Sequence, residues 1–183
     1  MSDTTPREKL LRRGQEVLVE RGRLSDLTLR GLAERLGTSH RMLIHHFGSR
    51  DGYLAALLSD LRRQELAALR AASAEGTYRD ALRLLEEIYL DPAQQPRITA
   101  FFYVLGLAVQ DPGTYREFLD SLEDWVVLCS AWGEREGLAP QVARARAQAL
   151  IWTSRGLLVK GIATGDVPGA LRELREVIDH LGW

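Results

Sequence analysis

The order of apolar and polar residues predicts helices along almost the whole chain. Apolar residues return every three or four positions, the spacing that places side chains on one face of an α-helix. No stretch alternates convincingly with period two, so no strand is expected. Glycine and proline mark the breaks between the periodic segments. The pattern therefore predicts an all-α fold of about nine helices.

The first predicted helix carries Leu10, Leu11, Val17 and Leu18 at helical spacing, and Gly22 ends it. The remaining helices are expected at 29–36, from Thr38 or Ser39 to Phe47, and at 50–73, 79–91, 96–110, 114–136, 140–164 and 168–181.

The second and third predicted helices follow each other within a few residues. Thr28 is placed to cap the first of them, and Thr38 or Ser39 to cap the second. Gly37 can adopt the positive φ that a sharp turn needs, and Leu43 lies where it fills the angle between the helices. This layout is that of a helix-turn-helix, whose second helix can enter a major groove. The other interpretation is a glycine-linked helix pair in a protein that does not bind DNA.

The segment GTSHRMLIHHFGSR at 37–50 contains three histidines. On a helix of two turns each residue advances about 100°, so His40, His45 and His46 do not converge on one metal ion. No carboxylate is placed to orient an imidazole beside Ser39, which argues against a catalytic cluster. No metal site is expected here. Because the chain also shows no phosphate-cradling glycine loop, neither a cofactor nor an enzyme activity is expected.

A surface that contacts DNA fits this segment better. With Leu43 and Phe47 buried, the opposite face of the short helix points outward. That face consists of His40, Arg41, Met42, Ile44 and His45. Arginine reads guanine, histidine donates or accepts, and apolar groups touch thymine methyls. Thr38 and Ser39 at the helix start suit phosphates, as does Arg50 in the next helix.

Charge is distributed unevenly along the chain. The formal net charge of the whole chain is −1, but residues 1–70 carry +4 and the remainder carries −5. A basic first part indicates that this part alone contacts a polyanion.

Cys129 is the single cysteine, which fits a reducing compartment. The N-terminus lacks the apolar run of a signal peptide, and no stretch reaches the roughly 18 apolar residues of a membrane span. A cytoplasmic protein is expected.

Aromatic residues gather in the later helices. Trp125, Cys129 and Trp132 recur at i, i+4 and i+7 and so share a face. They form either a core stripe or, with others, the lining of an apolar cavity for a small apolar or aromatic molecule. Arg155 lies in an otherwise apolar stretch, where it could orient that molecule. The candidate lining is Leu85, Tyr89, Phe101, Phe102, Leu105, Trp125, Cys129, Trp132, Trp152 and Arg155.

The helices at 140–164 and 168–181 are too apolar for full exposure to solvent. One face of each is expected to pack inside the subunit, and a second face to pair with another copy. A twofold dimer places two recognition helices about one DNA turn apart, so the operator should be roughly palindromic.

Three stretches of the chain resemble the TetR family of transcriptional regulators. They are LLRRGQEVLVERG at 10–22, TLRGLAERLGTSHRMLIHHFGSR at 28–50 and GYL at 52–54. The resemblance implies a homodimer of all-α subunits. It further implies that the first three helices bind DNA, that the last two pair in a four-helix interface, and that a small molecule releases the protein from its operator. We expect a DNA-binding domain at 1–50 and a ligand-binding and dimerisation domain at 51–183, connected by the helix at 50–73.

The resemblance also implies roles for individual residues. Arg30 is expected to contact DNA backbone or bases, His46 lies near phosphate, and Arg50 replaces the usual lysine on phosphate. The full set of predicted DNA contacts is Thr28, Arg30, Thr38, Ser39, His40, Arg41, Met42, Ile44, His45, His46 and Arg50.

Some residues depart from the family pattern. Ile44 stands where a tyrosine usually contacts phosphate, so we expect His45 to supply that contact. Arg13 and Gly14 replace alanines in the first helix. Gly14 either allows closer packing or weakens the helix. The departures leave a second hypothesis open, in which a dimeric ligand-binding or interaction protein of the same fold has lost specific DNA binding.

Overall fold

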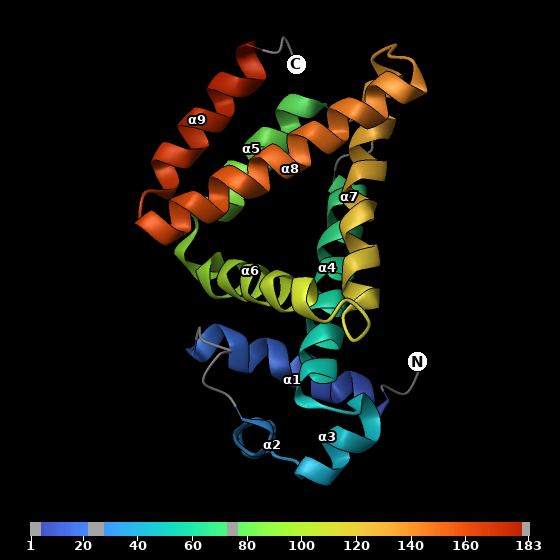
Figure 1. The fold of residues 1–183 in the computed structure, drawn as a ribbon, viewed down its shortest axis with the longest axis vertical. Helices are drawn as coiled ribbons and strands as arrows, with labels where there is room; N and C mark the ends of the chain where they lie inside the picture. The colour runs from blue at the N-terminus through green and yellow to red at the C-terminus, as the bar shows by residue number, and fades with distance from the viewer. Residues whose placement is uncertain (1–4, 22–27, 73–76, 181–183) are drawn as a thin grey trace. The chain divides into compact units, whose positions relative to one another are not determined.

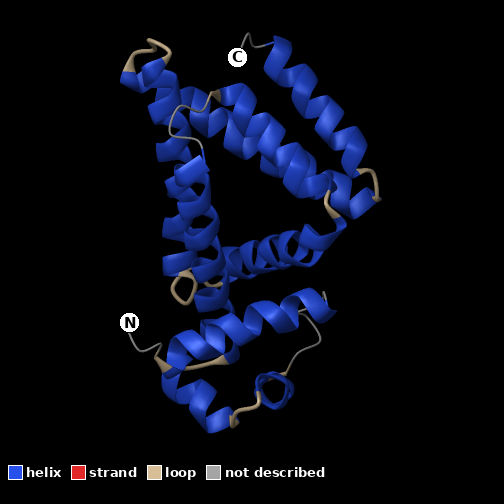
Figure 2. Ribbon diagram, turned by 180° about the vertical axis from the view of Figure 1, so that it is seen from behind, coloured by secondary structure: helices blue, strands red, loops and turns tan. Residues whose placement is uncertain are grey.

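The computed structural model describes residues 5–21, 28–72 and 77–180, and all regular structure in these ranges is helical (Figures 1 and 2). The predicted all-α fold is therefore confirmed. The helices are α1 (Pro6–Arg21), α2 (Leu29–Leu36), α3 (His40–Phe47), α4 (Arg50–Ala72), α5 (Tyr78–Leu90), η1 (Pro92–Gln94), α6 (Gln95–Gln110), α7 (Arg116–Arg135), α8 (Pro140–Thr164) and α9 (Val167–His180). Within the described ranges no helix has the length and hydropathy of a membrane span.

Helix boundaries follow the predicted caps closely. Thr28 accepts a hydrogen bond on its hydroxyl from the Gly31 N–H at 3.1 Å. Ser39, and not Thr38, caps α3, because its hydroxyl accepts from the Met42 N–H at 3.2 Å. The 3₁₀ turn η1 between α5 and α6 was not predicted. Each of these two side-chain caps satisfies one backbone N–H that the helix itself leaves without a partner.

The chain divides into two compact units. The first comprises residues 1–65 and 93–121, and the second comprises 66–92 and 122–183. The two units are defined by which residues pack together, and not by what they do. The functional division at residue 50 stays a prediction.

In the first unit, Gly14 allows α1 and α4 to approach closely. A Cβ at Gly14 would lie 1.9 Å from the hydroxyl oxygen of Tyr53. That hydroxyl donates to the Leu10 carbonyl at 3.3 Å, and the Tyr53 side chain is completely buried. Burial raises the pKa of Tyr53 above its ordinary range. Of the two interpretations of Gly14, the structure therefore supports closer packing.

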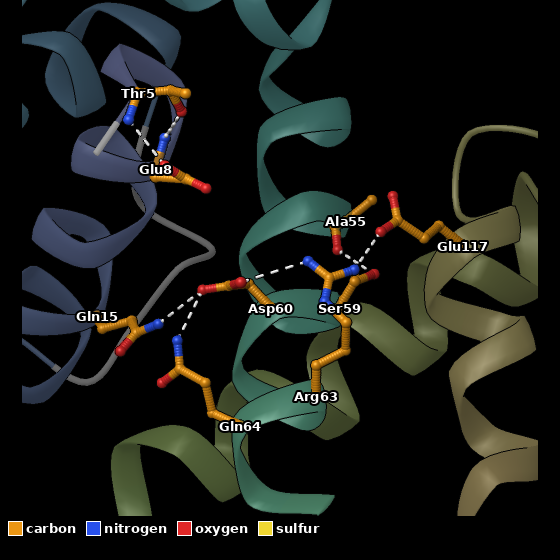
Figure 3. A network of polar contacts seen from close by, with 9 residues as sticks. All are labelled: Thr5, Glu8, Gln15, Ala55, Ser59, Asp60, Arg63, Gln64 and Glu117. Atoms are coloured by element: carbon orange, nitrogen blue, oxygen red, sulfur yellow. Dashed lines mark hydrogen bonds and ion pairs between the residues drawn. The ribbon is translucent and has the colours of Figure 1, made fainter. Parts of the chain in front are cut away.

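Polar contacts tie three helices of the first unit together (Figure 3). Gln15 of α1 donates to Asp60 of α4 at 3.0 Å, and Asp60 also accepts from Arg63 at 3.3 Å. Arg63 in turn pairs with Glu117 at the start of α7. The network joins α1, which packs on the helix-turn-helix, to α4 and to the first residues of α7.

The core of the second unit lies between α7, α8 and α9. It is built from Val126, Cys129, Trp132, Ala147, Leu150, Ile151, Leu174 and Ile178. Gly161 allows α8 to approach α9 closely, since a Cβ there would lie 2.7 Å from the Cβ of Ala170. The outer face of α9 is polar. Its exposed residues are Arg172, Glu173, Arg175, Glu176, Asp179 and His180. The apolar residues of α9 are used inside the subunit, against α8 and α5. The pairing of a second face of this helix with another copy stays a prediction.

Candidate functional site

The helix-turn-helix is formed by α2, α3 and the turn between them. Gly37 ends α2 with φ of 63°, a left-handed conformation that glycine adopts without strain. Leu43 is completely buried, and Leu32 and Leu36 are 2% exposed. The apolar side of α3 is thus held firmly against α2, and its orientation is fixed by packing.

The opposite face of α3 lies open to solvent, as predicted. His40, Arg41, Met42, Ile44 and His45 are all exposed. Two of them are large apolar side chains, Met42 at 39% and Ile44 at 46% exposure. An arginine between apolar and imidazole groups offers both hydrogen bonds to base edges and contacts to thymine methyls. This surface can read a major groove, and its contacts with DNA stay a prediction.

His46 differs from the other histidines because it is partly enclosed. Its ring packs edge-on against His45 and Phe47, with centroids 4.9 Å and 6.2 Å away. Its Nε2 is buried and has no hydrogen-bond partner among the described residues. A buried polar atom without a partner is costly. The contact of His46 with phosphate stays a prediction.

Arg50 lies at the start of α4, where Ser49 caps the helix by accepting from the Gly52 N–H at 2.9 Å. The Arg50 guanidinium donates to Asp51 at 2.8 Å and to the Tyr103 hydroxyl at 3.2 Å. Tyr103 belongs to α6 and was not singled out in the sequence. Because Tyr103 is 53 residues away from Arg50 along the chain, no local sequence pattern predicts their hydrogen bond. The predicted phosphate contact is thus positioned by a helix outside the predicted DNA-binding domain.

The remaining predicted DNA contacts lie on α2 and the turn. Thr28 is exposed at the N-terminus of α2, and Thr38 is half-buried after Gly37. Arg30 makes an ion pair with Glu34 at 3.5 Å, and both side chains are well exposed. Exposed pairs of this kind contribute at most about 1 kcal/mol, so the pair leaves Arg30 able to bind phosphate.

Within the described residues no group of three or more His, Cys, Asp or Glu side chains is arranged to hold a metal ion. Among the histidines of α3, His40 and His45 are exposed, and the His46 ring packs against Phe47.

The candidate effector residues are divided between the two units. Phe101, Phe102 and Leu105 lie half-buried on α6 in the first. Phe101 packs against Phe102 and Phe118, with ring centroids 5.1 Å and 5.7 Å away, and the Arg62 guanidinium lies 5.1 Å from its centroid. Arg62 also donates to the hydroxyl and carbonyl of Ser121. This is an aromatic cluster with a fixed cation beside it.

The other candidates lie in the second unit. Cys129 and Trp132 are part of its core, with Trp125 packed against them. The indole nitrogens of Trp125 and Trp132 are buried and have no acceptor among the described residues. Burial raises the pKa of the Cys129 thiol to about 12, and the nearby Arg155 opposes this shift. Tyr89 is half-buried, and the side chain of Leu85 lies outside the described residues.

Trp152 lies on the surface, although the sequence placed it among the residues that line the ligand cavity. It is 50% exposed on α8, and the buried Arg155 stacks on its ring at 4.5 Å. The residue before it, Ile151, faces the core, and one step along a helix turns a side chain by about 100°. Trp152 therefore points outward from the subunit.

Trp152 is the centre of an exposed apolar stripe along α8. Its members are Val142, Ala145, Ala149, Trp152, Gly156, Val159 and Ala163, all exposed. The intervals between them alternate between three and four residues, which is the spacing of the positions at which two helices pair. Small residues on both sides of Trp152 leave space into which another helix can fit.

Comparison with known proteins yields relatives by structure alone. No protein-family model and no curated protein matches the sequence. A TetR-family transcriptional regulator structure from Rhodococcus sp. has a TM-score of 0.71, 22% identity, and coverage of 94% of this chain and 96% of that one. A transcriptional regulator from Rhodococcus sp. Rha1 has a TM-score of 0.71, 24% identity, and coverage of 96% and 97%. E. coli NemR in its reduced form has a TM-score of 0.66, 19% identity, and coverage of 93% and 95%.

Proposed function

We propose that this protein, whose fold is that of TetR-family transcriptional regulators, is a ligand-responsive regulator that binds double-stranded DNA as a homodimer. The observation that carries the proposal is the exposed face of α3. Leu43 and the Ser39 cap fix this helix, and Arg41 lies exposed with four neighbours suited to base edges. Both similar structures from Rhodococcus are those of transcriptional regulators.

The dimer is supported by the stripe on α8. A contiguous exposed row of apolar and small side chains is uncommon on a monomeric protein and marks an interaction surface. Pairing of α8 with its copy buries Trp152 and the residues of the stripe. A twofold axis then relates two α3 helices, so the operator is roughly palindromic.

The effector is an apolar or aromatic molecule that also carries hydrogen-bond acceptors. Aromatic side chains predominate among the candidate contacts, which favours an apolar ligand. The buried indole N–H groups of Trp125 and Trp132 lack acceptors in the described part of the chain. Since a buried donor without a partner is costly, an effector that accepts from either gains affinity. Binding of the effector releases the DNA, so the protein acts as a repressor.

Fluorescence anisotropy tests the proposal. Labelled DNA from upstream of the protein's own gene is titrated at several salt concentrations, beside a scrambled duplex of equal length. We expect the native duplex to bind about 10³-fold tighter or more, with a steep salt dependence. Equal and weak binding to both duplexes, and to a pool of genomic fragments, would favour the second hypothesis, a protein of this fold without specific DNA binding.

A further inference from the structure

A charged pocket of about 420 Å³ lies between α1 and α2 in the first unit. No residue of α3 lines it, so it is separate from the face proposed to read DNA. Its lining consists of Lys9, Arg12, Arg13, Glu16, Val17 and Arg35. The described lining therefore holds four cationic side chains and one carboxylate. The volume is within the range of small-molecule sites, roughly 300–1,000 Å³, but the lining is charged where such sites are usually apolar.

The cations of this pocket are not neutralised within the described residues. No side-chain ion pair or hydrogen bond of Lys9, Arg12, Arg13 or Arg35 is found in those ranges. The carboxylate next to Arg35 in sequence, Glu34, pairs instead with Arg30.

Other carboxylates near α1 are also engaged elsewhere. Asp60 accepts hydrogen bonds from Gln15 and Arg63, and Glu8 accepts from the Thr5 N–H at 2.7 Å. Among the described residues that line the pocket, Glu16 is the one carboxylate beside the four cations. Like charges that converge without partners repel one another, and a bound anion removes that repulsion.

The Arg13 guanidinium lies next to the turn of the helix-turn-helix. A Cβ at Gly37 would lie 3.3 Å from the Cζ and from both terminal nitrogens of Arg13. Equal distances to the three atoms show that the guanidinium lies flat over the turn. The N–H groups lie in the plane of the guanidinium, so they point parallel to the surface of the turn and not into it. Because a guanidinium fork is planar and pre-organised, less side-chain entropy is lost for each hydrogen bond that it forms.

We propose that this pocket binds phosphate oxygens, carried either by a free oligophosphate or by the backbone of DNA. Guanidinium forks match the geometry of phosphate, and a lysine adds a compact charge. An excess of cations over carboxylates excludes cationic ligands and favours a multiply charged anion. The resemblance to the TetR family implies no role for Arg13, because alanine usually stands at its position. In this pocket, Arg13 would bind phosphate oxygens.

The first arm of the test needs no DNA. Tripolyphosphate is titrated into the full-length protein by calorimetry, with sulfate as the control anion. We expect Arg12→Gln/Arg13→Gln to weaken tripolyphosphate binding by about tenfold or more, since the change removes two charge-assisted hydrogen-bonding groups. Arg116→Gln/Arg172→Gln removes two exposed charges elsewhere and should leave the affinity within about twofold. Glu16→Gln should tighten binding, an effect that a damaged fold does not produce.

The second arm rests on the proposed DNA binding. Salt dependence of binding to a duplex is measured for the wild type and for both double variants. If the pocket takes backbone phosphates, the salt slope of Arg12→Gln/Arg13→Gln falls by about one unit for each phosphate no longer bound, while that of Arg116→Gln/Arg172→Gln does not. A change in the first arm alone identifies a free oligophosphate as the ligand.

The proposal is overturned if Arg12→Gln/Arg13→Gln matches Arg116→Gln/Arg172→Gln in both arms. A chain that binds no DNA at all would refute the proposed function, and the tripolyphosphate titration would still decide on the pocket. Circular dichroism confirms that each variant is folded, and glutamine keeps a helix propensity close to that of arginine.

Discussion

At the scale of single residues, Gly14 determines how closely α1 can lie against α4. The hydroxyl of Tyr53 occupies the space that a side chain at position 14 would need. Glycine inside a helix costs about 1 kcal/mol relative to alanine. Here that cost is offset by the complete burial of the Tyr53 ring and by its hydrogen bond to Leu10.

Gly14→Ala should therefore destabilise the protein, by about 1–3 kcal/mol, although alanine favours helix. Gly106→Ala is the matched control, because Gly106 is also helical and a Cβ added there would meet no atom within 4 Å. That change should stabilise by up to about 1 kcal/mol. Urea denaturation measures both. Adding Tyr53→Phe to Gly14→Ala should recover part of the loss, and stabilisation by Gly14→Ala alone would contradict the packing described.

Cys129 should be inert toward thiol reagents in the folded protein. With its pKa raised to about 12 by burial, the reactive thiolate is scarce at about pH 8 and becomes abundant only as the pH approaches that value. Labelling by a chromogenic disulfide should follow unfolding across a urea titration. Fast labelling in the absence of urea would show that the thiol is accessible.

At the scale of elements, the short helices were predictable because their signals are local. Caps at Thr28 and Ser39 and the left-handed Gly37 lie within a few residues of the structures that they define. Tyr103 beside Arg50 and the pocket between α1 and α2 were not predicted, since each joins side chains that are distant in sequence. The exposure of Trp152 was not predicted either, because α8 carries apolar residues on more than one face.

The apolar stripe on α8 should determine the oligomeric state. Trp152→Glu places a charge at its centre, so we expect sedimentation velocity to show a dimer for the wild type and monomers for the variant. Val109→Glu is the control, since Val109 is 78% exposed on α6 and lies outside the stripe. A Trp152→Glu variant that remains dimeric at micromolar concentration would place the dimer interface on another surface.

At the scale of the whole molecule, polar contacts extend from the helices proposed to bind DNA to elements outside the predicted domain of residues 1–50. Arg50 is held by Tyr103 of α6, and Asp60 and Arg63 connect α1 with the start of α7. A small molecule that displaces α6 would therefore alter the position of Arg50. Because Arg50 is expected to contact phosphate, Arg50→Ala should weaken binding to all duplexes and lower the salt slope by about one unit.

The central claim is that the exposed face of α3 reads a specific DNA sequence. The most direct test is the ratio of affinities for the operator and for scrambled DNA, measured by anisotropy for the wild type and for Arg41→Ala, with Arg172→Ala as a control for the removed charge. We predict that Arg41→Ala lowers this ratio by about tenfold, as expected when one side chain no longer reads its base, while Arg172→Ala leaves it unchanged. An unchanged ratio in Arg41→Ala would show that another surface selects the sequence.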